Sequence, residues 1–421
     1  MAKINTICVQ EGYKPKKGEA RVTPIVQSTT FYYEKASQLA DLFDLKTEGF
    51  FYSRVANPTV DVLEKKVAAI EGGVAALACA SGQAAVLLSI LNVCKAGDNI
   101  ISSASIYGGS HNLMNVTLRR YGIEARFFDP EAEDSEIEKL IDEKTKLIYG
   151  ETIANPSMII LDFEKLSRIA KKHKVLFVVD NTLATAILIR PIEFGANVIV
   201  YSSSKYLDGH AVALGGVLVD CGNFDYNNNS RYQDFYSFDE SYHGVKYADN
   251  KSPFVTKAKV QLLRDLGPTM APQNAFLTVL GIETLGLRML KHSENAKAVA
   301  EFLDKHPKVA WVKSPNLKDN KYHGLALKYL PKGCGGMLSF GIKGGLEKVA
   351  LFLESLKLIA LVTHIADVRS SLLHPASTTH RQMSLVDLEK CGVSSDLIRL
   401  SIGIEDISDI IEDIRQALEK V

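Results

Sequence analysis

From residue 74 to residue 220 the 421-residue chain alternates short apolar runs with amphipathic stretches, and this alternation constrains the fold more than any other feature of the sequence. The apolar runs have the composition of buried strands and occupy residues 74–79, 99–103, 124–128, 146–150, 175–180, 198–200 and 216–220. Helical patterns lie between them at residues 82–94, 109–120, 134–143 and 162–172. This order predicts an α/β fold with a mostly parallel, seven-stranded sheet covered by helices on both faces.

The segments on either side of this alternation predict two further parts. Residues 1–57 have too little apolar patterning to form a core, so we expect an N-terminal arm that lies on a neighbouring subunit. The large domain then spans residues 58–271, although its polar and aromatic stretch at 225–247 fits no element. A long helical pattern from Pro272 to Phe302 opens residues 272–421, which we expect to form a smaller C-terminal α+β domain.

Composition excludes several classes of protein. The 49 basic and 49 acidic residues balance, which argues against a nucleic acid or an anionic membrane as partner. The six cysteines include no CxxC pair, so we expect a reducing cytoplasm rather than a disulfide scaffold, and no metal site. We expect no secretory signal, because no apolar segment follows Met1-Ala2-Lys3, and no apolar run reaches the roughly 18 residues of a membrane span.

Lys205 is the first candidate for chemistry. It follows an apolar strand and three serines, so it lies just past the carboxyl end of that strand, at the edge where open α/β sheets bind ligands. A lysine at this position can act as a Schiff-base nucleophile once its ammonium loses a proton. The plain alternative is a solvated loop lysine.

Two other strand ends complete a pattern with Lys205. Ser81, Gly82 and Gln83 form a small-residue turn before a helix, where backbone N–H groups favour a phosphate, although a tight connection explains the turn equally well. Asp180 ends the strand before that of Lys205 and can hold a pyridine nitrogen protonated; alone, it reads more simply as a helix N-cap or a Mg²⁺ ligand. An amine, a carboxylate and a phosphate turn together indicate pyridoxal phosphate (PLP).

On these residues the chain resembles the Cys/Met-metabolism group of PLP-dependent enzymes, which have fold type I, and the resemblance covers essentially the full length. The motifs that carry it are YSR at 52–54, SGQAA at 81–85, YGGS at 107–110, ETIANP at 151–156, VDNT at 179–182, SSSKYLDGH at 202–210, HPASTTH at 374–380 and RLSIGIE at 399–405.

The resemblance implies roles around the cofactor. Ser202 and Ser204 would help to hold the phosphate, and an extended segment would place both on one face. Tyr107 would stack on the cofactor ring and shuttle a proton, where a core aromatic is the alternative. Asn155 would form a hydrogen bond with the phenolic oxygen, where a plain Asn-Pro turn is the alternative.

Three further positions take their roles from the resemblance. Tyr52 and Arg54 would reach the phosphate from the neighbouring subunit, which gives the arm a purpose and implies a homo-oligomer, by family habit a homotetramer. Arg399 would bind the α-carboxylate of the substrate bidentately, unless it forms a surface ion pair.

The chain departs from the family pattern at three places. Residues 363–367 read THIAD where the family commonly carries a Leu-Gly pair, so His364 either adjusts the grip on the substrate or is structural. Ser204 replaces the threonine that often precedes the lysine. Gln83 replaces the methionine of related lyases, and with Ser241-Tyr242-His243-Gly244 it favours the sulfhydrylase subgroup.

The resemblance therefore implies a γ-replacement reaction: O-acetyl-L-homoserine and sulfide, or a thiol, give L-homocysteine and acetate, a step of methionine biosynthesis. Lys205 would remove the α-proton while Asp180 keeps the ring protonated. A methionine or cystathionine γ-lyase remains an alternative, because none of these residues separates elimination from replacement. A non-catalytic PLP-fold regulatory protein would be expected to lack Lys205 or Arg399, and this chain has both.

Overall fold

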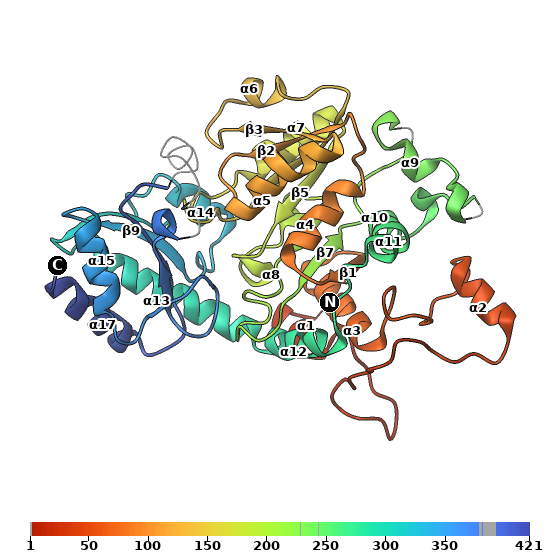
Figure 1. The fold of residues 1–421 in the computed structure, drawn as a ribbon, viewed down its shortest axis with the longest axis horizontal. Coiled ribbons are helices and arrows are strands. Elements are labelled where there is room, and N and C mark those ends of the chain that lie inside the picture. The colour runs from red at the N-terminus through yellow and green to blue at the C-terminus, as the bar shows by residue number, and fades with distance from the viewer. Residues whose placement is uncertain (1, 228, 243, 379–380, 382–392) are drawn as a thin grey trace.

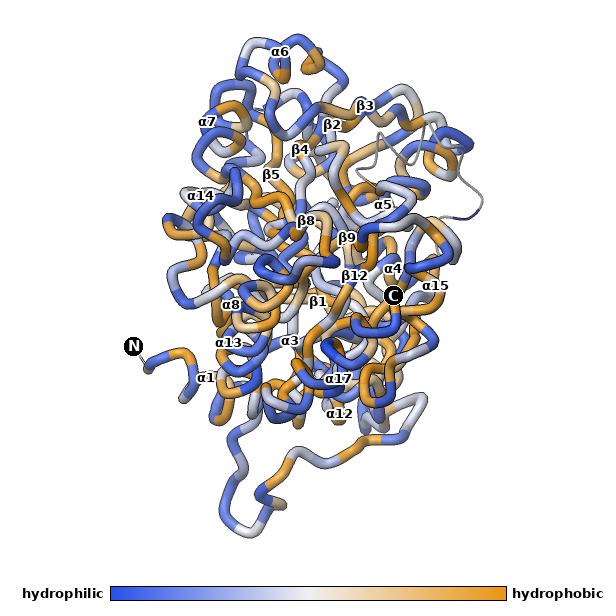
Figure 2. The backbone as a smooth tube through the Cα atoms, turned by 90° about the vertical axis from the view of Figure 1, so that its left-hand side faces the viewer, coloured by the Kyte–Doolittle hydropathy of each residue, from blue (hydrophilic) through white to orange (hydrophobic). Residues whose placement is uncertain are grey.

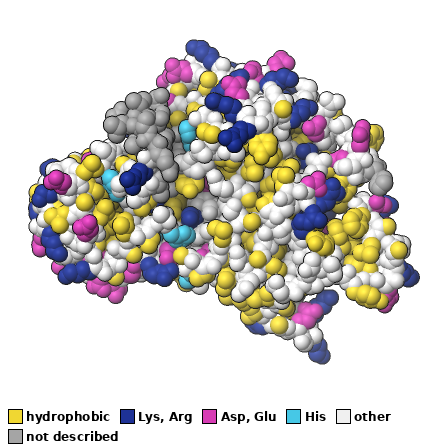
Figure 3. Space-filling model, in the orientation of Figure 1, with side chains coloured by type: hydrophobic (Ala, Val, Ile, Leu, Met, Phe, Trp, Pro, Cys, Tyr) yellow, Lys and Arg dark blue, Asp and Glu magenta, His cyan; other side chains and the backbone are white. Residues whose placement is uncertain are grey.

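Two β-sheets organise the protein (Figure 1). The computed structural model describes residues 2–227, 229–242, 244–378, 381 and 393–421. Within these residues one sheet has seven strands and the other has five. The surface is hollowed between the two parts of the molecule, where basic and histidine side chains come together (Figure 3).

The seven-stranded sheet confirms the predicted α/β architecture. Its spatial order is β1-β7-β6-β5-β4-β2-β3, and only β7 runs antiparallel to its neighbours in the described sheet. The strands are β1 Ala75–Cys79, β2 Asn99–Ser103, β3 Glu124–Phe128, β4 Thr145–Glu151, β5 Leu176–Asp180, β6 Val198–Tyr201 and β7 Gly216–Asp220. All the predicted strands are present, within one or two residues of their expected bounds.

Alternation along the central strands separates two buried cores, one on each face. Phe177 and Val179 of β5 belong to a core with α3 (Pro58–Glu71) and α7 (Phe163–His173), whereas Val178 belongs to a core with α4 (Gly82–Leu91). Side chains of a strand alternate between faces, so both faces need helical cover. In Figure 2 the apolar segments accordingly gather around the strands, and the outer helix α6 (Asp134–Glu138) is largely hydrophilic.

Two predicted helices are shorter or less regular than expected. The pattern at 109–120 forms α5 (Gly108–Asn112), a π-helical turn (Leu113–Thr117) and a 3₁₀ turn (Leu118–Tyr121). Helix α6 ends at Glu138 rather than near residue 143. Asp142 explains this end, because its carboxylate accepts the N–H of Lys144 at 2.8 Å and its own N–H donates to the Thr145 hydroxyl, which fixes a turn into β4.

The stretch at 225–247, which fitted no predicted element, forms short helical turns around buried aromatic rings. Tyr226 stacks on Phe235 with centroids 4.1 Å apart, and Tyr247 is fully buried nearby in the same core. The elements from here to residue 266 are Ser230–Tyr232, α9 Gln233–Tyr236, Glu240–Tyr242, Tyr247–Asp249, α10 Pro253–Lys257, a π-helical Ala258–Leu263 and α11 Arg264–Leu266, preceded in the chain by α8 Thr185–Leu188 and Pro191–Phe194.

The N-terminal segment leaves the body of the molecule, as Figure 1 shows. Its first helix, α1 (Ile4–Gln10), packs on α3, where Lys66 Nζ donates to the Cys8 carbonyl at 2.7 Å. The rest, including α2 (Ala36–Phe43), exposes large apolar side chains, and Tyr32 is 88% exposed. Exposed aromatic rings on an extended segment are typical of a surface that another chain covers.

The long helical pattern that begins at Pro272 is interrupted at Thr284, between α12 (Pro272–Glu283) and α13 (Leu285–Asp304). Helix α12 packs in the same core as α3. The second sheet has the order β10-β11-β12-β9-β8. Its chain contains β8 Val309–Lys313, α14 His323–Tyr329, β9 Met337–Ile342, α15 Leu346–Ser355, β10 Ala360–Leu361, β11 Ser371–Leu373, Pro375–Ser377, β12 Leu397–Ser401 and α17 Ile407–Glu419. None of the helices described here combines the length and apolar character that a bilayer crossing requires.

Candidate active site

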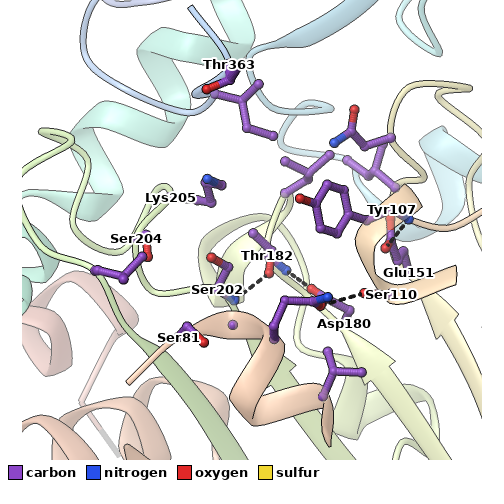
Figure 4. Close-up of a pocket in the computed structure, with 18 of the residues that line it drawn as sticks. Ser81, Tyr107, Ser110, Glu151, Asp180, Thr182, Ser202, Ser204, Lys205 and Thr363 are labelled. Carbon is purple, nitrogen blue, oxygen red and sulfur yellow. Dashed lines mark hydrogen bonds between the residues drawn. The ribbon is translucent and has the colours of Figure 1, made fainter. Parts of the chain in front are cut away.

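A pocket of about 240 Å³ opens at the carboxyl ends of β5 and β6, facing the second sheet (Figure 4). The structure brings most of the predicted site residues into it. These are Ser81, Gly82, Gln83, Tyr107, Asn155, Asp180, Ser202, Ser204, Lys205 and Arg399. They come from segments more than 300 residues apart in the chain, so their convergence is a property of the fold.

Lys205 lies in a tight turn directly after β6. Its N–H donates to the Ser202 carbonyl at 3.2 Å, and its carbonyl accepts the N–H of Gly209 at 2.7 Å, so the backbone on both sides is fixed. Burial, and to a smaller extent the charge of Arg399, lowers the pKa of the Lys205 ammonium to about 8. A larger fraction of this lysine than of an ordinary one is therefore a neutral, nucleophilic amine near neutral pH.

The two serines reach the pocket by a turn, and the extended conformation considered from the sequence is wrong, because β6 ends at Tyr201. Ser202 N donates to the Thr182 hydroxyl at 2.9 Å. The Ser204 hydroxyl accepts the N–H of Gly215 at 2.9 Å and donates to the Gly215 carbonyl at 3.2 Å. Both side chains still line the pocket, because the tight turn rather than strand alternation directs them there.

Asp180 ends β5 and is held by two donors. Its Oδ1 accepts the N–H of Thr182 at 2.9 Å and its Oδ2 accepts the Tyr149 hydroxyl at 3.2 Å. Burial raises the pKa of the Asp180 carboxyl, and the hydrogen bonds from Thr182 and Tyr149 oppose that rise. The result is an acceptor-only group fixed at the floor of the pocket (Figure 4).

Glu151 is a functional candidate that the sequence reasoning missed. It ends β4, directly opposite Asp180 on β5, and its Oε1 accepts the N–H of Tyr107 at 2.6 Å. Burial, followed by the charge of Asp180, raises the pKa of Glu151 well above its ordinary value. The available signal was the ETIANP motif, which Glu151 opens at a predicted strand end. Other lining residues that were not predicted from the sequence are Val86, Ser110, Ile153, Thr182, Leu183, Leu214, Thr363 and Ile365.

The start of α4 forms a cradle with the turn after β6. Ser81 caps the helix, its hydroxyl accepting the N–H of Ala84 at 3.2 Å. A Cβ at Gly82 would lie 2.6 Å from the Ser202 Cβ and 2.8 Å from its Cα, so only glycine permits this approach. Gln83 turns away from the cradle toward Ser110, whose hydroxyl donates to its Oε1 at 3.4 Å.

Tyr107 stands above the cradle with 48% of its surface exposed. Its ring packs against Gly109, and a Cβ at that position would lie only 2.5 Å from the Tyr107 Cε1. Asn155 lies close by, and its buried Oδ1 has no hydrogen-bond partner in the described part of the chain. A buried amide oxygen without a partner is costly, so this atom faces a place where a polar group is expected.

Arg399 approaches from the second sheet, on β12. It is 6% exposed, one of its terminal nitrogens donates to the Thr363 carbonyl at 3.1 Å, and its buried Nε has no partner among the described residues. Burial lowers the pKa of the Arg399 guanidinium to about 10. A buried cation with a free N–H edge is suited to a carboxylate ligand.

Three predicted residues lie outside this pocket. His364 lines an adjoining cavity, and its Nδ1 is 3.4 Å from the Lys205 Nζ. Tyr52 and Arg54 lie on the N-terminal arm, where the Arg54 guanidinium stacks over the Tyr52 ring at 5.3 Å and donates to the Arg264 carbonyl. One chain therefore does not bring Tyr52 and Arg54 to its own pocket. Of the predicted motif residues, His243, Thr379 and His380 lie outside the described residues.

The residues that are present fit PLP. The glycine cradle with its serine hydroxyls suits a phosphate, Asp180 suits a protonated ring nitrogen, and Lys205 suits the aldehyde. The unpartnered Asn155 oxygen shows that the pocket leaves a polar side chain for a ligand to satisfy. This agrees with the donor set that the sequence predicts.

Comparison with known proteins supports the same cofactor. Residues 5–419 match the model of the Cys/Met metabolism PLP-dependent enzyme family. An O-acetyl-L-homoserine sulfhydrylase from Leptospira meyeri is 41% identical, over 100% of this chain and 97% of that protein. A homocysteine synthase from Schizosaccharomyces pombe is 40% identical, over 99% and 98% of the two chains.

A solved structure is similar throughout. It is a crystal structure assigned to O-acetylhomoserine (thiol)-lyase from Campylobacter jejuni, with a TM-score of 0.97 and 41% identity over 99% of this chain and 100% of that one. That protein carries a pyridoxyl-lysine monophosphate at its position 205.

Proposed function

This chain belongs to the Cys/Met metabolism PLP-dependent enzyme family, and we propose that it converts O-acetyl-L-homoserine and sulfide to L-homocysteine and acetate by γ-replacement. The observation that supports this most directly is the single pocket that holds Lys205, Asp180 and Arg399. Two relatives, 41% identical over 100% of this chain and 43% identical over 94% of it, carry the name of this activity.

Each group in the pocket has a proposed task. Bound PLP supplies an electron sink that stabilises negative charge developing at the substrate carbons. Lys205 moves the proton at the α-carbon, with the Tyr107 hydroxyl as a second proton-transfer group. Asp180 holds the proton on the cofactor ring nitrogen. Arg399 binds the α-carboxylate through its free N–H edge, which fixes the amino acid against the Lys205 amine.

The cofactor is proposed to be held at both ends. The start of α4 with Ser81 and Gly82, and the hydroxyls of Ser202 and Ser204, bind the phosphate; Asn155 binds the phenolic oxygen, and Gln83 braces Ser110 beside the ring. Tyr52 and Arg54 reach the phosphate from a neighbouring subunit, since one chain keeps them away from its own pocket. The active assembly is then a homo-oligomer, by family habit a tetramer.

The organisation proposed for the chain follows from these roles. Residues 1–57 form the arm that reaches the neighbouring subunit, 58–271 the PLP-binding domain, and 272–421 the smaller domain that carries Arg399. A cytoplasmic location is proposed with it, and the five described cysteines, all buried and free, are compatible with that compartment.

The test is an assay of the purified holoenzyme with O-acetyl-L-homoserine and sodium sulfide, in which homocysteine is measured directly. O-succinyl-L-homoserine, methionine and cystathionine are assayed in parallel, and their α-keto acid products are measured. The Lys205→Ala variant is the matched control and should form no product. Keto acid from methionine or cystathionine without homocysteine from the acetyl ester would identify a γ-lyase instead.

A further inference from the structure

A second cavity, of about 210 Å³, adjoins the main pocket, and Lys205, Arg399 and Tyr107 line both. Its other walls include His364 and Pro375. Lys205, His364 and Arg399 are its basic residues, and no carboxylate is among the described residues that form it. Such a lining favours a small anion or a group that is about to become one.

The His364 imidazole is positioned between the two sheets. Its Nδ1 lies 3.4 Å from the Lys205 Nζ, and its Nε2 is buried without a partner in the described chain. The segment that follows it is anchored at two points, where the Ala366 N–H donates to the Ser401 hydroxyl at 2.7 Å and the Val368 N–H donates to the Gly209 carbonyl at 3.0 Å. One nitrogen therefore contacts the amine, and the other is left for a ligand.

The surroundings keep this imidazole neutral. Burial, and then the charge of Lys205, lowers the pKa of His364 below its ordinary value. The titratable and charged groups around it are Lys205, Asp208, Asp367, Arg369, and across the cavity Arg399 and Tyr107. When Lys205 is the neutral amine, the His364 Nδ1–H donates to it, and Nε2 carries the free lone pair of a base.

We propose that this second cavity receives the sulfur nucleophile of the function proposed above, and that His364 accepts its proton. Hydrogen sulfide or a thiol is a poor nucleophile until the S–H bond breaks. Acetate leaves the γ-carbon with the electron pair of its C–O bond. The S–H proton then passes to the His364 Nε2, and the sulfur lone pair forms the bond to the γ-carbon. The imidazolium finally releases its proton, so that homocysteine, acetate and one proton result.

This assignment separates the two substrates in space. The main pocket holds the cofactor and the amino acid, whose carboxylate is proposed to bind Arg399. The sulfur donor approaches from the side of His364, and its negative charge is favoured there by Arg399. His364 is then specific to the sulfur half of the reaction.

The experiment compares the wild-type holoenzyme with His364→Asn and His364→Gln at about pH 6 and about pH 9. At the lower pH, where undissociated hydrogen sulfide dominates, the kcat/KM for sulfide should fall by about 10-fold or more in both variants. At the higher pH the hydrosulfide ion needs no base, so the deficit should shrink to about twofold. The kcat/KM for O-acetyl-L-homoserine should change little at either pH.

A control variant, His173→Asn, removes a half-exposed imidazole on α7 and should leave both constants unchanged. A second readout is the change in cofactor absorbance when O-acetyl-L-homoserine is added without sulfide, which should keep its wild-type rate in the His364 variants. An equal, pH-independent loss for both substrates would overturn the role of His364. A wild-type enzyme that forms no homocysteine would instead refute the proposed function.

Discussion

Glu151 and Asp180 face one another as in-register partners at the ends of β4 and β5. Glu151 is buried and Asp180 is partly exposed in the pocket; burial raises the pKa of each, and the Asp180 charge raises that of Glu151 further. Only Glu151 has its pKa raised well above the ordinary value, with the Asp180 charge as a cause, so we assign the negative charge to Asp180 and the proton to Glu151.

This assignment predicts opposite outcomes for two isosteric substitutions. Glu151→Gln imitates the protonated acid and keeps an acceptor for the Tyr107 N–H, so kcat/KM should change by about threefold or less. Asp180→Asn removes the charge that holds the ring proton and should reduce kcat/KM by about 100-fold or more. Steady-state kinetics with O-acetyl-L-homoserine and sulfide check both. Equal losses in the two variants would contradict the placement of the proton.

The lowered pKa of Lys205 predicts how the apoenzyme takes up PLP. Only the neutral amine attacks the aldehyde, so the uptake rate should rise with pH and level off above about pH 8, rather than near the ordinary lysine value of 10.5. Stopped-flow absorbance of apoenzyme mixed with PLP measures this profile.

Arg399 contributes to that lowering, so Arg399→Gln should move the same profile to higher pH. Burial is the larger cause, and the profile should therefore stay below the ordinary lysine value. Arg369→Gln, which removes an exposed guanidinium paired with Asp367, is the control and should leave the profile unchanged. An unshifted profile in Arg399→Gln would show that burial alone is responsible.

The distance of Arg54 from its own pocket predicts complementation between subunits. Arg54→Ala and Lys205→Ala should each be almost inactive alone. In a dimer with shared sites, a mixed pair has one intact site, so random co-assembly should restore about a quarter of wild-type activity. Activity of the co-expressed, purified mixture is the measurement.

The control for complementation is the mixture of Lys205→Ala with Asp180→Asn. Both residues belong to the pocket of one chain, so every mixed site keeps a defect, and no activity should return. If the Arg54→Ala mixture also stays inactive, the arm does not complete a neighbouring site.

The close approach of Gly82 to Ser202 predicts a specific loss of cofactor binding. In Gly82→Ala the new methyl group would meet the Ser202 backbone, which must shift by tenths of an ångström, at a cost of about 1–3 kcal/mol. The Kd for PLP, measured by fluorescence titration of the apoenzyme, should rise at least about 10-fold. Gly324→Ala, where a Cβ meets nothing within 4 Å, should leave it unchanged.

The central part of the site could be predicted because it depends on local rules. Lys205 and Asp180 each follow a buried apolar run, and parallel strands bring their carboxyl ends to one edge. The same rules did not reveal Glu151 as a partner of Asp180. The sequence pattern of a strand does not determine which other strand lies beside it, so the pairing of β4 with β5 could not be predicted. The contact between Lys205 and His364 joins residues 159 apart, on segments of two different sheets, and no local pattern encodes it.

The type of helix at residues 113–121 also could not be predicted from the sequence pattern. Met114 and Leu118 lie four residues apart and are both buried, as an α-helix requires, yet the backbone there is π-helical and then 3₁₀. The spacing of apolar residues predicts which side chains face the core. It does not predict which carbonyl accepts each backbone N–H, and therefore whether the helix is α, π or 3₁₀.

The functional residues of the pocket come from two separate sheets. Asp180 ends β5 and Lys205 follows β6, and these two strands are hydrogen-bonded neighbours in one sheet. Arg399 lies on β12 of the other sheet, and His364 lies in the segment between its strands β10 and β11. Mutations in the second sheet can therefore change the specificity for the amino acid or the sulfur donor without changing the distance between Asp180 and Lys205. Directed evolution toward new thiol substrates is best aimed at residues 363–368 and β12.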